Sequence, residues 1–411
     1  MAEPEAHKEM LKTNFCGIEM PNPFILASAP PTATGDMIKQ AFKAGWGGAV
    51  TKTLAMDKDR VSNVTPRLYS LSFPGRYGGT GKLYGLENIE LATERKLDIW
   101  LEEIESINRE YPNHMMIASI MASGVDKDSW QSLAKSCERA GTKMLELNFS
   151  CPHGLPEKGM GCVVGQDPEM CKTITGWVRK SCSIPIMPKL TPNITDIILP
   201  ALASIQEGAN AIAAINTVSV VMGVDLKSLN PLPDVGSHTT PGGYSGPAIK
   251  PIGLKAVSSL YNAVDVPISG VGGIENWRDA AEYMLLGAAT VQLCTAVMFH
   301  GYGIIDNLTA GLLQFMEEHG FKTIDEFVGV SADKITDHSK LNRTVKLVSR
   351  INGETCIRCR MCYVSCRDAG YQAITLGEKN LPLIDVKRCT GCSLCQQVCP
   401  VLGCVELVEA K

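Results

Sequence analysis

The sequence predicts an α/β protein in two domains, a (β/α)8 barrel followed by a small cysteine-rich domain. Short β-branched runs alternate with amphipathic stretches through residues 1–330, which is typical of a buried parallel sheet covered by helices. Eight of the sixteen cysteines then gather in the C-terminal part, in two copies of one spacing. A length of 411 residues also favours two cores over one.

Eight strands are predicted ahead of the cysteines, with helical stretches between them. The strands are Phe24–Ser28, Ala49–Lys52, Met116–Ile120, Met144–Asn148, Ile186–Leu190, Ala211–Ile215, Pro267–Gly270 and Thr290–Leu293. The helical stretches include Met37–Ala44, Glu94–Arg109, Ser129–Ala140, Pro168–Arg179 and Trp277–Leu286. Eight repeats in about 270 residues favour a closed barrel, and a doubly wound open sheet is the alternative.

The longest gap lies between the second and third predicted strands. It is rich in glycine and aromatic residues, namely Tyr77, Gly78, Gly79, Gly81, Tyr84 and Gly85. A barrel assembles its active site from the loops at the carboxyl ends of its strands. We therefore expect this segment to be an insertion that lies over the active-site face.

Polar residues cluster just past the carboxyl ends of the strands. They are Ser28, Lys52, Thr53, Asn148, Ser150, Cys151, Lys189, Asn216, Thr217, Gly272, Gly273 and Thr295. The loops after the last two strands, Gly270–Gly273 and Cys294–Thr295, predict a phosphate site, because glycines let backbone N–H groups approach an anion. A plain turn is the alternative at the glycines. Lys52 and Lys189 predict an anionic planar partner such as a reduced flavin, because an unpaired buried ammonium is costly.

The C-terminal cysteines repeat one pattern, Cys-x2-Cys-x2-Cys-x3-Cys, and Pro400 follows the second copy. This spacing predicts two [4Fe–4S] clusters, with the fourth cysteine of each copy bound to the other copy's cluster. The expected ligands are Cys356, Cys359, Cys362 and Cys399 for one cluster and Cys389, Cys392, Cys395 and Cys366 for the other. Zinc sites are the alternative, but tetrahedral zinc has no use for a third cysteine at the same step. We expect a barrel at 1–330, a linker at 331–346 and a ferredoxin-type electron-transfer domain at 347–411.

Composition excludes several classes of protein. A net charge of −4 shows no basic excess for nucleic acid or an anionic membrane. The longest apolar stretch, Ala211–Val224, contains Asn216, Thr217 and Ser219, so no membrane span is predicted. The N-terminus lacks the apolar core of a secretory signal, and the other eight cysteines have no disulfide-like spacing. A cytoplasmic location is therefore expected.

Several stretches resemble a known family. They are Leu147–Gly154, Gly165–Glu169, Lys189–Asn193, Asn216–Val218 and Gly243–Gly246. They resemble the pyrimidine-reducing half of the dihydropyrimidine dehydrogenase family, in which a dihydroorotate dehydrogenase-type FMN barrel precedes a two-cluster ferredoxin domain. The resemblance covers nearly the whole chain from about Asn14. Within the family, the chain is similar to the catalytic subunit of the bacterial NAD-dependent two-subunit enzyme.

The resemblance implies an activity and a set of site residues. The reaction is reduction of the 5,6 double bond of uracil or thymine, with hydride to C6 and a proton from Cys151 to C5. The implied FMN contacts are Ser28, Lys52, Thr53, Lys189, Gly246, Val271, Gly272, Gly273, Cys294 and Thr295. The implied pyrimidine contacts are Asn88, Asn148, Phe149, Ser150, Asn216 and Thr217. Carboxamides suit the alternating C=O and N–H groups of uracil, and a thiol of ordinary pKa, ~8.5, can donate a proton at neutral pH. A strand-ending turn is the alternative for Asn148 and the residues after it.

No Gly-x-Gly-x-x-Gly fingerprint for a dinucleotide occurs in the sequence, since Gly159-Met-Gly161 and Gly270-Val-Gly272 lack the third glycine. Electrons are therefore expected from a partner, an FAD- and NAD-binding oxidoreductase subunit or a free ferredoxin. Three alternatives stay open. They are dihydroorotate oxidation on the same barrel, reduction of another cyclic amide, and a non-catalytic electron-transfer subunit.

Overall fold

The structure is a computed structural model, and it describes residues 9–59, 62–72, 76–77, 83–151, 159–369 and 371–410. Its internal contacts divide the chain into two compact units, Met1–Ile335 and Thr336–Lys411. The division falls inside the segment that the sequence predicts as a linker. No helix among the described residues is long and apolar enough to cross a membrane.

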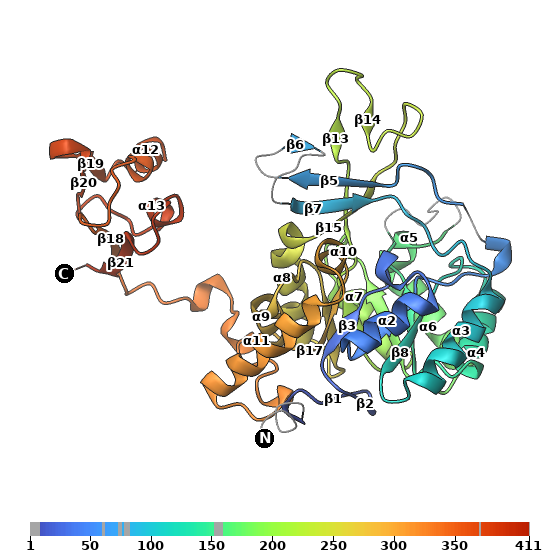
Figure 1. Cartoon of the computed structure of the whole chain (residues 1–411). Coiled ribbons are helices and arrows are strands. Elements are labelled where there is room, and N and C mark those ends of the chain that lie inside the picture. The colour runs from blue at the N-terminus through green and yellow to red at the C-terminus, as the bar shows by residue number, and fades with distance from the viewer. Residues whose placement is uncertain are drawn as a thin grey trace. The chain divides into compact units, whose positions relative to one another are not determined.

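The N-terminal unit is a closed barrel of eight parallel strands, as predicted (Figure 1). The strands are β3 (Phe24–Leu26), β4 (Gly48–Val50), β8 (Met115–Ile120), β9 (Met144–Asn148), β10 (Ile186–Leu190), β11 (Ile212–Ala214), β16 (Ile268–Val271) and β17 (Ala288–Leu293). The pairing of β17 with β3 closes the circle, so a doubly wound open sheet is excluded. All eight predicted strands are confirmed.

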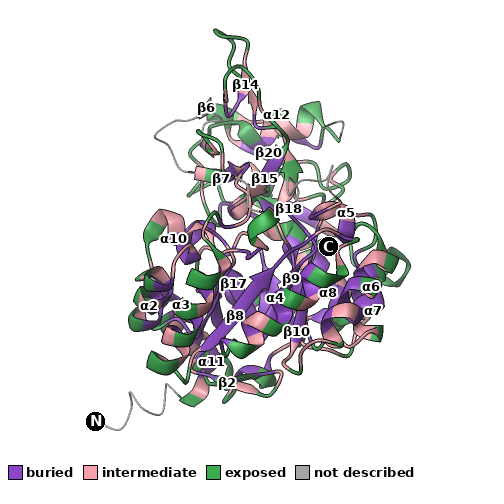
Figure 2. Cartoon of the chain, turned by 90° about the vertical axis from the view of Figure 1, so that its right-hand side faces the viewer, coloured by how far each residue is buried: buried purple, intermediate pink, exposed green. Residues whose placement is uncertain are grey.

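Helices surround the strands, and Figure 2 shows buried strands inside them. The longer ones are α2 (Gly35–Ala44), α3 (Leu97–Glu110), α4 (Lys127–Arg139), α6 (Pro168–Arg179), α7 (Ile198–Gln206), α8 (Lys250–Tyr261), α9 (Trp277–Leu285) and α11 (Ile304–His319). Local sequence sets their ends. At α6, the Asp167 carboxylate accepts hydrogen bonds from the N–H groups of Glu169 and Met170, and Pro168 stands at the first helical position.

Alternation along each strand separates an outer core from an inner one. In β9, Leu145 and Leu147 belong to the core between the strands and the helices, whereas Met144 belongs to a cluster inside the barrel. The hairpin of β1 (Thr13–Phe15) and β2 (Ile18–Met20) adds Phe15 and Met20 to that inner cluster. Each such side chain, when fully buried, contributes roughly 1.5–3 kcal/mol. The barrel interior is therefore packed and apolar at the end where the β1–β2 hairpin lies.

A five-stranded antiparallel sheet covers the opposite end of the barrel (Figure 1). It consists of β5 (Leu68–Ser72), β6 (Arg76–Tyr77), β7 (Leu83–Asn88), β12 (Val218–Val220) and β15 (Gly242–Ser245). The first three strands are the insertion predicted between the second and third barrel strands, and its place over the active-site face is confirmed. Gly78, Gly79 and Gly81 lie outside the described residues.

We call this five-stranded sheet the lid sheet. Its other strands were not predicted from the sequence. They come from the segment between β11 and α8, which also forms the hairpin of β13 (Gly223–Val224) and β14 (Pro231–Leu232). Pairing of β15 with β7 joins two insertions that are far apart in the sequence. The lid is therefore a joint product of both insertions.

The described part of the C-terminal unit contains two small antiparallel sheets and two short α-helices. The strand β18 (Leu347–Ile351) pairs with β21 (Val405–Glu409), and β19 (Ile374–Leu376) pairs with β20 (Pro382–Ile384). The helices are α12 (Met361–Asp368) and α13 (Leu394–Gln397). Helix α12 carries Cys362 and Cys366 of the first copy, and α13 carries Cys395 of the second.

Candidate active site and cluster sites

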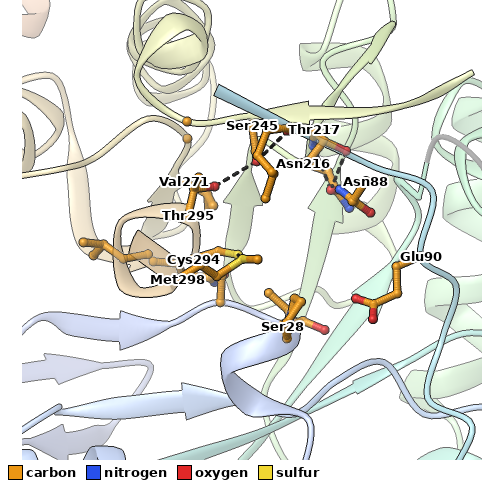
Figure 3. Close-up of a pocket in the computed structure, with 18 of the residues that line it drawn as sticks. Ser28, Asn88, Glu90, Asn216, Thr217, Ser245, Val271, Cys294, Thr295 and Met298 are labelled. Carbon is orange, nitrogen blue, oxygen red and sulfur yellow. Dashed lines mark hydrogen bonds between the residues drawn. The ribbon is translucent and has the colours of Figure 1, made fainter. Parts of the chain in front are cut away.

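A deep cavity lies where the carboxyl ends of the barrel strands meet the lid sheet (Figure 3). Its volume is about 1090 Å³, including the part open to solvent. The sequence-predicted site residues that line it are Ser28, Lys52, Thr53, Asn88, Asn148, Cys151, Lys189, Asn216, Thr217, Gly246, Val271, Gly272, Gly273, Cys294 and Thr295. The lining combines apolar side chains with a limited set of polar groups, which is typical of ligand-binding cavities.

The lid and the barrel are joined at this cavity by a hydrogen bond. Figure 3 shows Ser245 of the lid strand β15 beside Thr295, the first residue of the short helix α10 (Thr295–His300). The hydroxyl of Thr295 donates to the Ser245 hydroxyl over 2.8 Å. Ser245 and Met298 of α10 also line the cavity and were not predicted as site residues. Ser245 lies in the stretch Gly243–Gly246 that carries the family resemblance, whereas Met298 belongs to no recognisable motif.

Four predicted site residues form one hydrogen-bonded chain at the cavity wall. The Asn216 side-chain N–H group donates to the Ser150 hydroxyl over 2.8 Å. Ser150 donates through both its backbone N–H and its hydroxyl to Asn148 Oδ1, each over 3.2 Å. The Asn148 amide in turn donates to the Thr53 hydroxyl over 2.9 Å. The two amides are therefore held in fixed orientations before any substrate arrives.

Phe149 and Ser150 require a correction to the predicted substrate contacts. The Phe149 ring is fully buried and packs edge-on against Trp130, with ring centroids 5.8 Å apart. It belongs to the outer core, because side chains at the end of β9 alternate between the cavity and the helices. Ser150 is also fully buried, and its hydroxyl forms hydrogen bonds with the side chains of Asn148 and Asn216. Neither side chain lines the cavity.

The two lysines do not lack partners, which corrects the argument that their charges await an anionic ligand. Lys52 Nζ lies 2.6 Å from Glu90 Oε2, and Arg67 Nε lies 3.0 Å from the other oxygen of Glu90. Lys189 Nζ lies 3.7 Å from Glu146 Oε2. Burial alone would raise the pKa of Glu90, but Lys52 and then Arg67 outweigh it and lower that pKa. Both glutamates escaped sequence analysis, because they come from distant segments.

The rim near the last two strands is built from glycines that need positive φ. Gly246, Gly272 and Gly273 have φ angles of 98°, 125° and 71°. A Cβ atom on Gly273 would lie 2.6 Å from the backbone nitrogen of Lys250. Bare backbone at this rim matches the expected approach of N–H groups to a phosphate.

Cys294 lines the same rim. Burial raises the pKa of its thiol to about 11, although Lys52 and Lys189 act in the opposite direction. The thiol is therefore protonated at neutral pH and is no nucleophile. Its sulfur lies 3.7 Å from that of Met298.

The cysteines of the C-terminal unit converge in two cavities, each of which mixes both copies of the pattern. One is lined by Cys356, Cys359, Cys362 and Cys399, and the other by Cys366, Cys389, Cys392 and Cys395. Their volumes are about 310 and 360 Å³, each including the part open to solvent. Among the described residues, no three His, Cys, Asp or Glu side chains converge on a single metal ion. The sulfurs surround a space, which is the arrangement that a cluster requires.

Backbone N–H groups point at several of these sulfurs. Ala373 donates to Cys366 over 3.3 Å, and Ser349 donates to Cys389 over 3.5 Å. Such hydrogen bonds are among the features that set cluster reduction potentials. Cys404 borders the first cavity, but its thiol donates to the Asn352 carbonyl over 3.7 Å.

Comparison with known proteins agrees with this architecture. Residues 10–316 match the family model for dihydroorotate dehydrogenase, and residues 349–407 match that for a 4Fe-4S dicluster domain. A solved dihydroorotate dehydrogenase from Eimeria tenella, in complex with ferulenol, covers 78% of this chain and 88% of its own at a TM-score of 0.64 and 18% identity. That likeness shows the fold alone.

The sequence relatives are more specific. The chloroplastic dihydropyrimidine dehydrogenase (NADP(+)) of Arabidopsis thaliana is 44% identical over 82% of this chain and 80% of its own length. The NAD-dependent dihydropyrimidine dehydrogenase subunit PreA of Escherichia coli K12 is 39% identical over 98% of this chain and 96% of its own. The catalytic subunit of dihydroorotate dehydrogenase B from Methanocaldococcus jannaschii is 39% identical over 78% of this chain and 98% of its own.

The fold and the cavities define an oxidoreductase with a dihydroorotate dehydrogenase-type barrel and a 4Fe-4S dicluster domain. Within that class, the chain belongs to the dihydropyrimidine dehydrogenase family. The two domains imply FMN in the barrel and iron–sulfur clusters in the C-terminal unit. The residues present fit these groups, because four predicted cluster ligands line each small cavity, and Lys52, Lys189 and the glycine rim line the large one.

Proposed function

We propose that this chain reduces the 5,6 double bond of uracil or thymine. The observation that carries the proposal is the convergence of three asparagines and one thiol in the flavin-type cavity. Asn88 comes from the lid, Asn148 and Asn216 from the ends of two barrel strands, and Cys151 from the loop after β9. This set offers amide groups for a cyclic diamide beside a source of protons.

Hydrogen bonding supports recognition of a pyrimidine. Asn88 uses one N–H group on the Gly243 carbonyl, at 3.1 Å, and keeps its other groups for a ligand. Asn216 is held by Ser150 on one side, and its Oδ1 accepts from the Thr217 N–H over 2.7 Å. A cavity that presents such fixed amides discriminates against rings that cannot pair with them, because the amides would be left unsatisfied.

Cys151 is assigned the proton transfer to C5. Its side chain is buried and packs with Met121 and Met160, which form an apolar wall beside it. When bound, FMN supplies the hydride for C6, fed with single electrons from the clusters. Cys151 then has to deliver only a proton, a step that typically contributes roughly 10²–10⁴-fold to the rate.

The cofactor contacts belong to the same proposal. Lys189 would stabilise negative charge on the reduced flavin, and the glycine rim with Thr295 would hold the phosphate. The proposed FMN contacts are Ser28, Lys52, Thr53, Lys189, Gly246, Val271, Gly272, Gly273, Cys294 and Thr295. The proposed cluster ligands are Cys356, Cys359, Cys362 and Cys399, and Cys389, Cys392, Cys395 and Cys366. Their arrangement around the two small cavities supports this exchange of the fourth cysteine.

Dihydroorotate is the rival substrate, since a relative is named for that reaction. Orotate carries a carboxylate, for which a free cation in the cavity would be the natural partner. The two lysines of the cavity lining that the structure describes, Lys52 and Lys189, each have a carboxylate beside them. This pairing favours the uncharged pyrimidines.

A partner subunit is implied, because the Escherichia coli relative is named as a subunit. We assign to the partner the binding of FAD and of the nicotinamide dinucleotide, for which this sequence holds no glycine fingerprint. The ferredoxin-type unit then serves as the entry point for electrons. Isolated chain should leave NADH unoxidised.

The proposal is tested by anaerobic turnover with reduced methyl viologen as the donor. The wild-type chain should reduce uracil and thymine faster than orotate. Cys151→Ala should lose roughly 10²–10⁴-fold in rate, because only the proton donor is removed. Cys162→Ala, a change at a neighbouring cysteine, is the matched control and should retain most activity. Wild-type preference for orotate, or full activity of Cys151→Ala, would contradict the assignment. If the chain accepted electrons from the donor and transferred them to another acceptor but reduced neither pyrimidine, the non-catalytic electron-transfer alternative would be favoured.

A further inference from the structure

A buried carboxylate lies inside the barrel, next to a lysine that lines the cavity, and the proposed reaction gives it no role. Glu146 stands in the middle of β9, and its side chain is 0% exposed. Its Oε2 accepts from Gln292 Nε2 over 3.3 Å and lies 3.7 Å from Lys189 Nζ. Its Oε1 has no hydrogen-bond partner among the described residues. A carboxylate buried with so few partners is costly, so its presence calls for a reason.

The strand register places this carboxylate at a boundary inside the barrel. Asn148 pairs with Lys189, and Glu146 pairs with Met187. Glu146 therefore lies one inward-facing layer below Lys189, while Met187 and Met144 belong to the apolar inner core. A charge at this boundary is poorly screened, and its effect on Lys189 is larger than at the surface.

Gln292 connects the two charged groups across the barrel. It projects from β17, its Oε1 accepts from Lys189 Nζ over 3.3 Å, and its N–H group donates to Glu146. Lys189 has a side-chain exposure of 5%, so its ammonium has little water to turn toward. The amide and the carboxylate together hold the ammonium at the cavity floor.

We propose that Glu146 is a positioning residue for Lys189 and that its negative charge holds down the reduction potential of the flavin. This inference rests on the proposed function. Reduced flavin carries more negative charge than oxidised flavin, so a lysine beneath it favours reduction. Glu146 offsets part of that effect. The result is a stronger hydride donor, which suits reduction of a pyrimidine double bond.

Anaerobic potentiometry of the FMN signal in the full chain tests this inference. Glu146→Gln keeps the size of the side chain and removes its charge. We expect its flavin potential to become more positive by a tenfold change in the reduction equilibrium, about 30 mV for a two-electron couple. Oxidised FMN should bind with wild-type affinity and reduced FMN about tenfold more tightly, since the two measurements are thermodynamically linked.

Two further variants separate charge from packing. Glu146→Asp keeps the charge and should restore the potential toward the wild-type value. Glu103→Gln makes the same chemical change on α3, where Glu103 forms an ion pair with Arg95. Neither residue lines the cavity, so this variant should leave the potential unchanged. A potential for Glu146→Gln that is unchanged or more negative would overturn the inference.

The ion pair is also tested by urea unfolding, which needs no FMN. Lys189→Met should lower the unfolding midpoint, because it leaves Glu146 buried beside no cation. Adding Glu146→Gln should recover part of that loss, and a double variant no more stable than Lys189→Met would refute the pairing. A wild-type chain that binds no FMN or reduces no uracil would refute the proposed function. A functional wild-type chain with an unchanged potential in Glu146→Gln would refute only this inference.

Discussion

The core of the barrel and the core of the C-terminal unit are made from different side chains. The barrel buries Trp46, Trp100 and Trp130 completely, within a large aliphatic and aromatic cluster. The hydrophobic cluster in the described part of the C-terminal unit has five buried residues, and three of them are cysteines. Two of these, Cys362 and Cys395, are proposed cluster ligands.

This difference separates two ways of holding a redox group. The barrel encloses a cavity that its own packing supports, so its fold does not depend on what the cavity contains. A unit of 76 residues, Thr336–Lys411, has a small core in any case. Here the ligands are a large part of that core. Because cofactor binding is then also folding energy, the C-terminal unit should be stable only with its clusters in place.

The largest effect should therefore follow cluster loss. Cys362→Ser removes a ligand from the first cavity, and we expect the whole C-terminal unit to unfold while the barrel remains folded. Limited proteolysis followed by mass spectrometry would show cleavage confined to residues 336–411. Cys182→Ser, at a partly buried barrel cysteine, is the control and should leave both units resistant. Wild-type protease resistance of the C-terminal unit in Cys362→Ser would break the comparison.

Truncation of a side chain in the barrel core should have a smaller effect. It should destabilise the barrel and leave the C-terminal unit intact. Trp130 is fully buried against Phe149, and its indole N–H donates to the Ser123 carbonyl over 3.0 Å. Trp130→Ala should cost about 3–5 kcal/mol, because it leaves a cavity in the outer core. Urea unfolding should report this loss while the visible absorbance of the clusters stays intact at low urea.

A surface change just before the same helix is the control for that experiment. Val125 precedes α4 and is 84% exposed, so Val125→Ala should change stability by less than about 0.5 kcal/mol. Loss of cluster absorbance in Trp130→Ala before the barrel unfolds would contradict the independence of the two cores.

The smallest effect concerns the cap of α4, which tests the barrel surface. The Asp126 carboxylate accepts from Lys58 over 2.6 Å and from the Ser129 N–H over 3.1 Å. These contacts, Lys58 first, lower the pKa of Asp126 from 3.8 to about 2. Since the folded pKa lies below the unfolded one, this stabilisation is complete above about pH 4 and is lost as the pH falls toward about 2.

Two substitutions at Asp126 separate the contribution of the helix cap from the acid dependence of this site. Asp126→Ala should cost about 1 kcal/mol at neutral pH, most of it from the lost cap, because exposed ion pairs contribute little. Asp126→Asn should keep the cap and remove the acid dependence of this site. Thermal unfolding between pH 2 and pH 7 measures both, and an acid limb that is equally steep in Asp126→Asn and wild type would contradict the assignment.

Local pattern in the sequence was sufficient for much of this architecture. The bounds of β9 and β10 were predicted to the residue, because β9 ends at the polar Asn148 and β10 is followed by the polar Thr191. The cysteine spacing predicted the two mixed sets that line the small cavities, since ligand spacing on a short loop is a local property. The motif that begins at Asn148 and contains Cys151 marked one wall of the active site.

Tertiary structure alone decided which groups face one another across the barrel. Glu146, Gln292 and Lys189 come from three strands, and no spacing in the sequence indicates that they meet. Phe149 lies within the motif that marks the site, yet it points into the outer core, because the exit of β9 turns its side chain away from the cavity. The reason is physical. Residue type and spacing act over a few residues, whereas the partner of a buried charge depends on which strands become neighbours when the barrel closes.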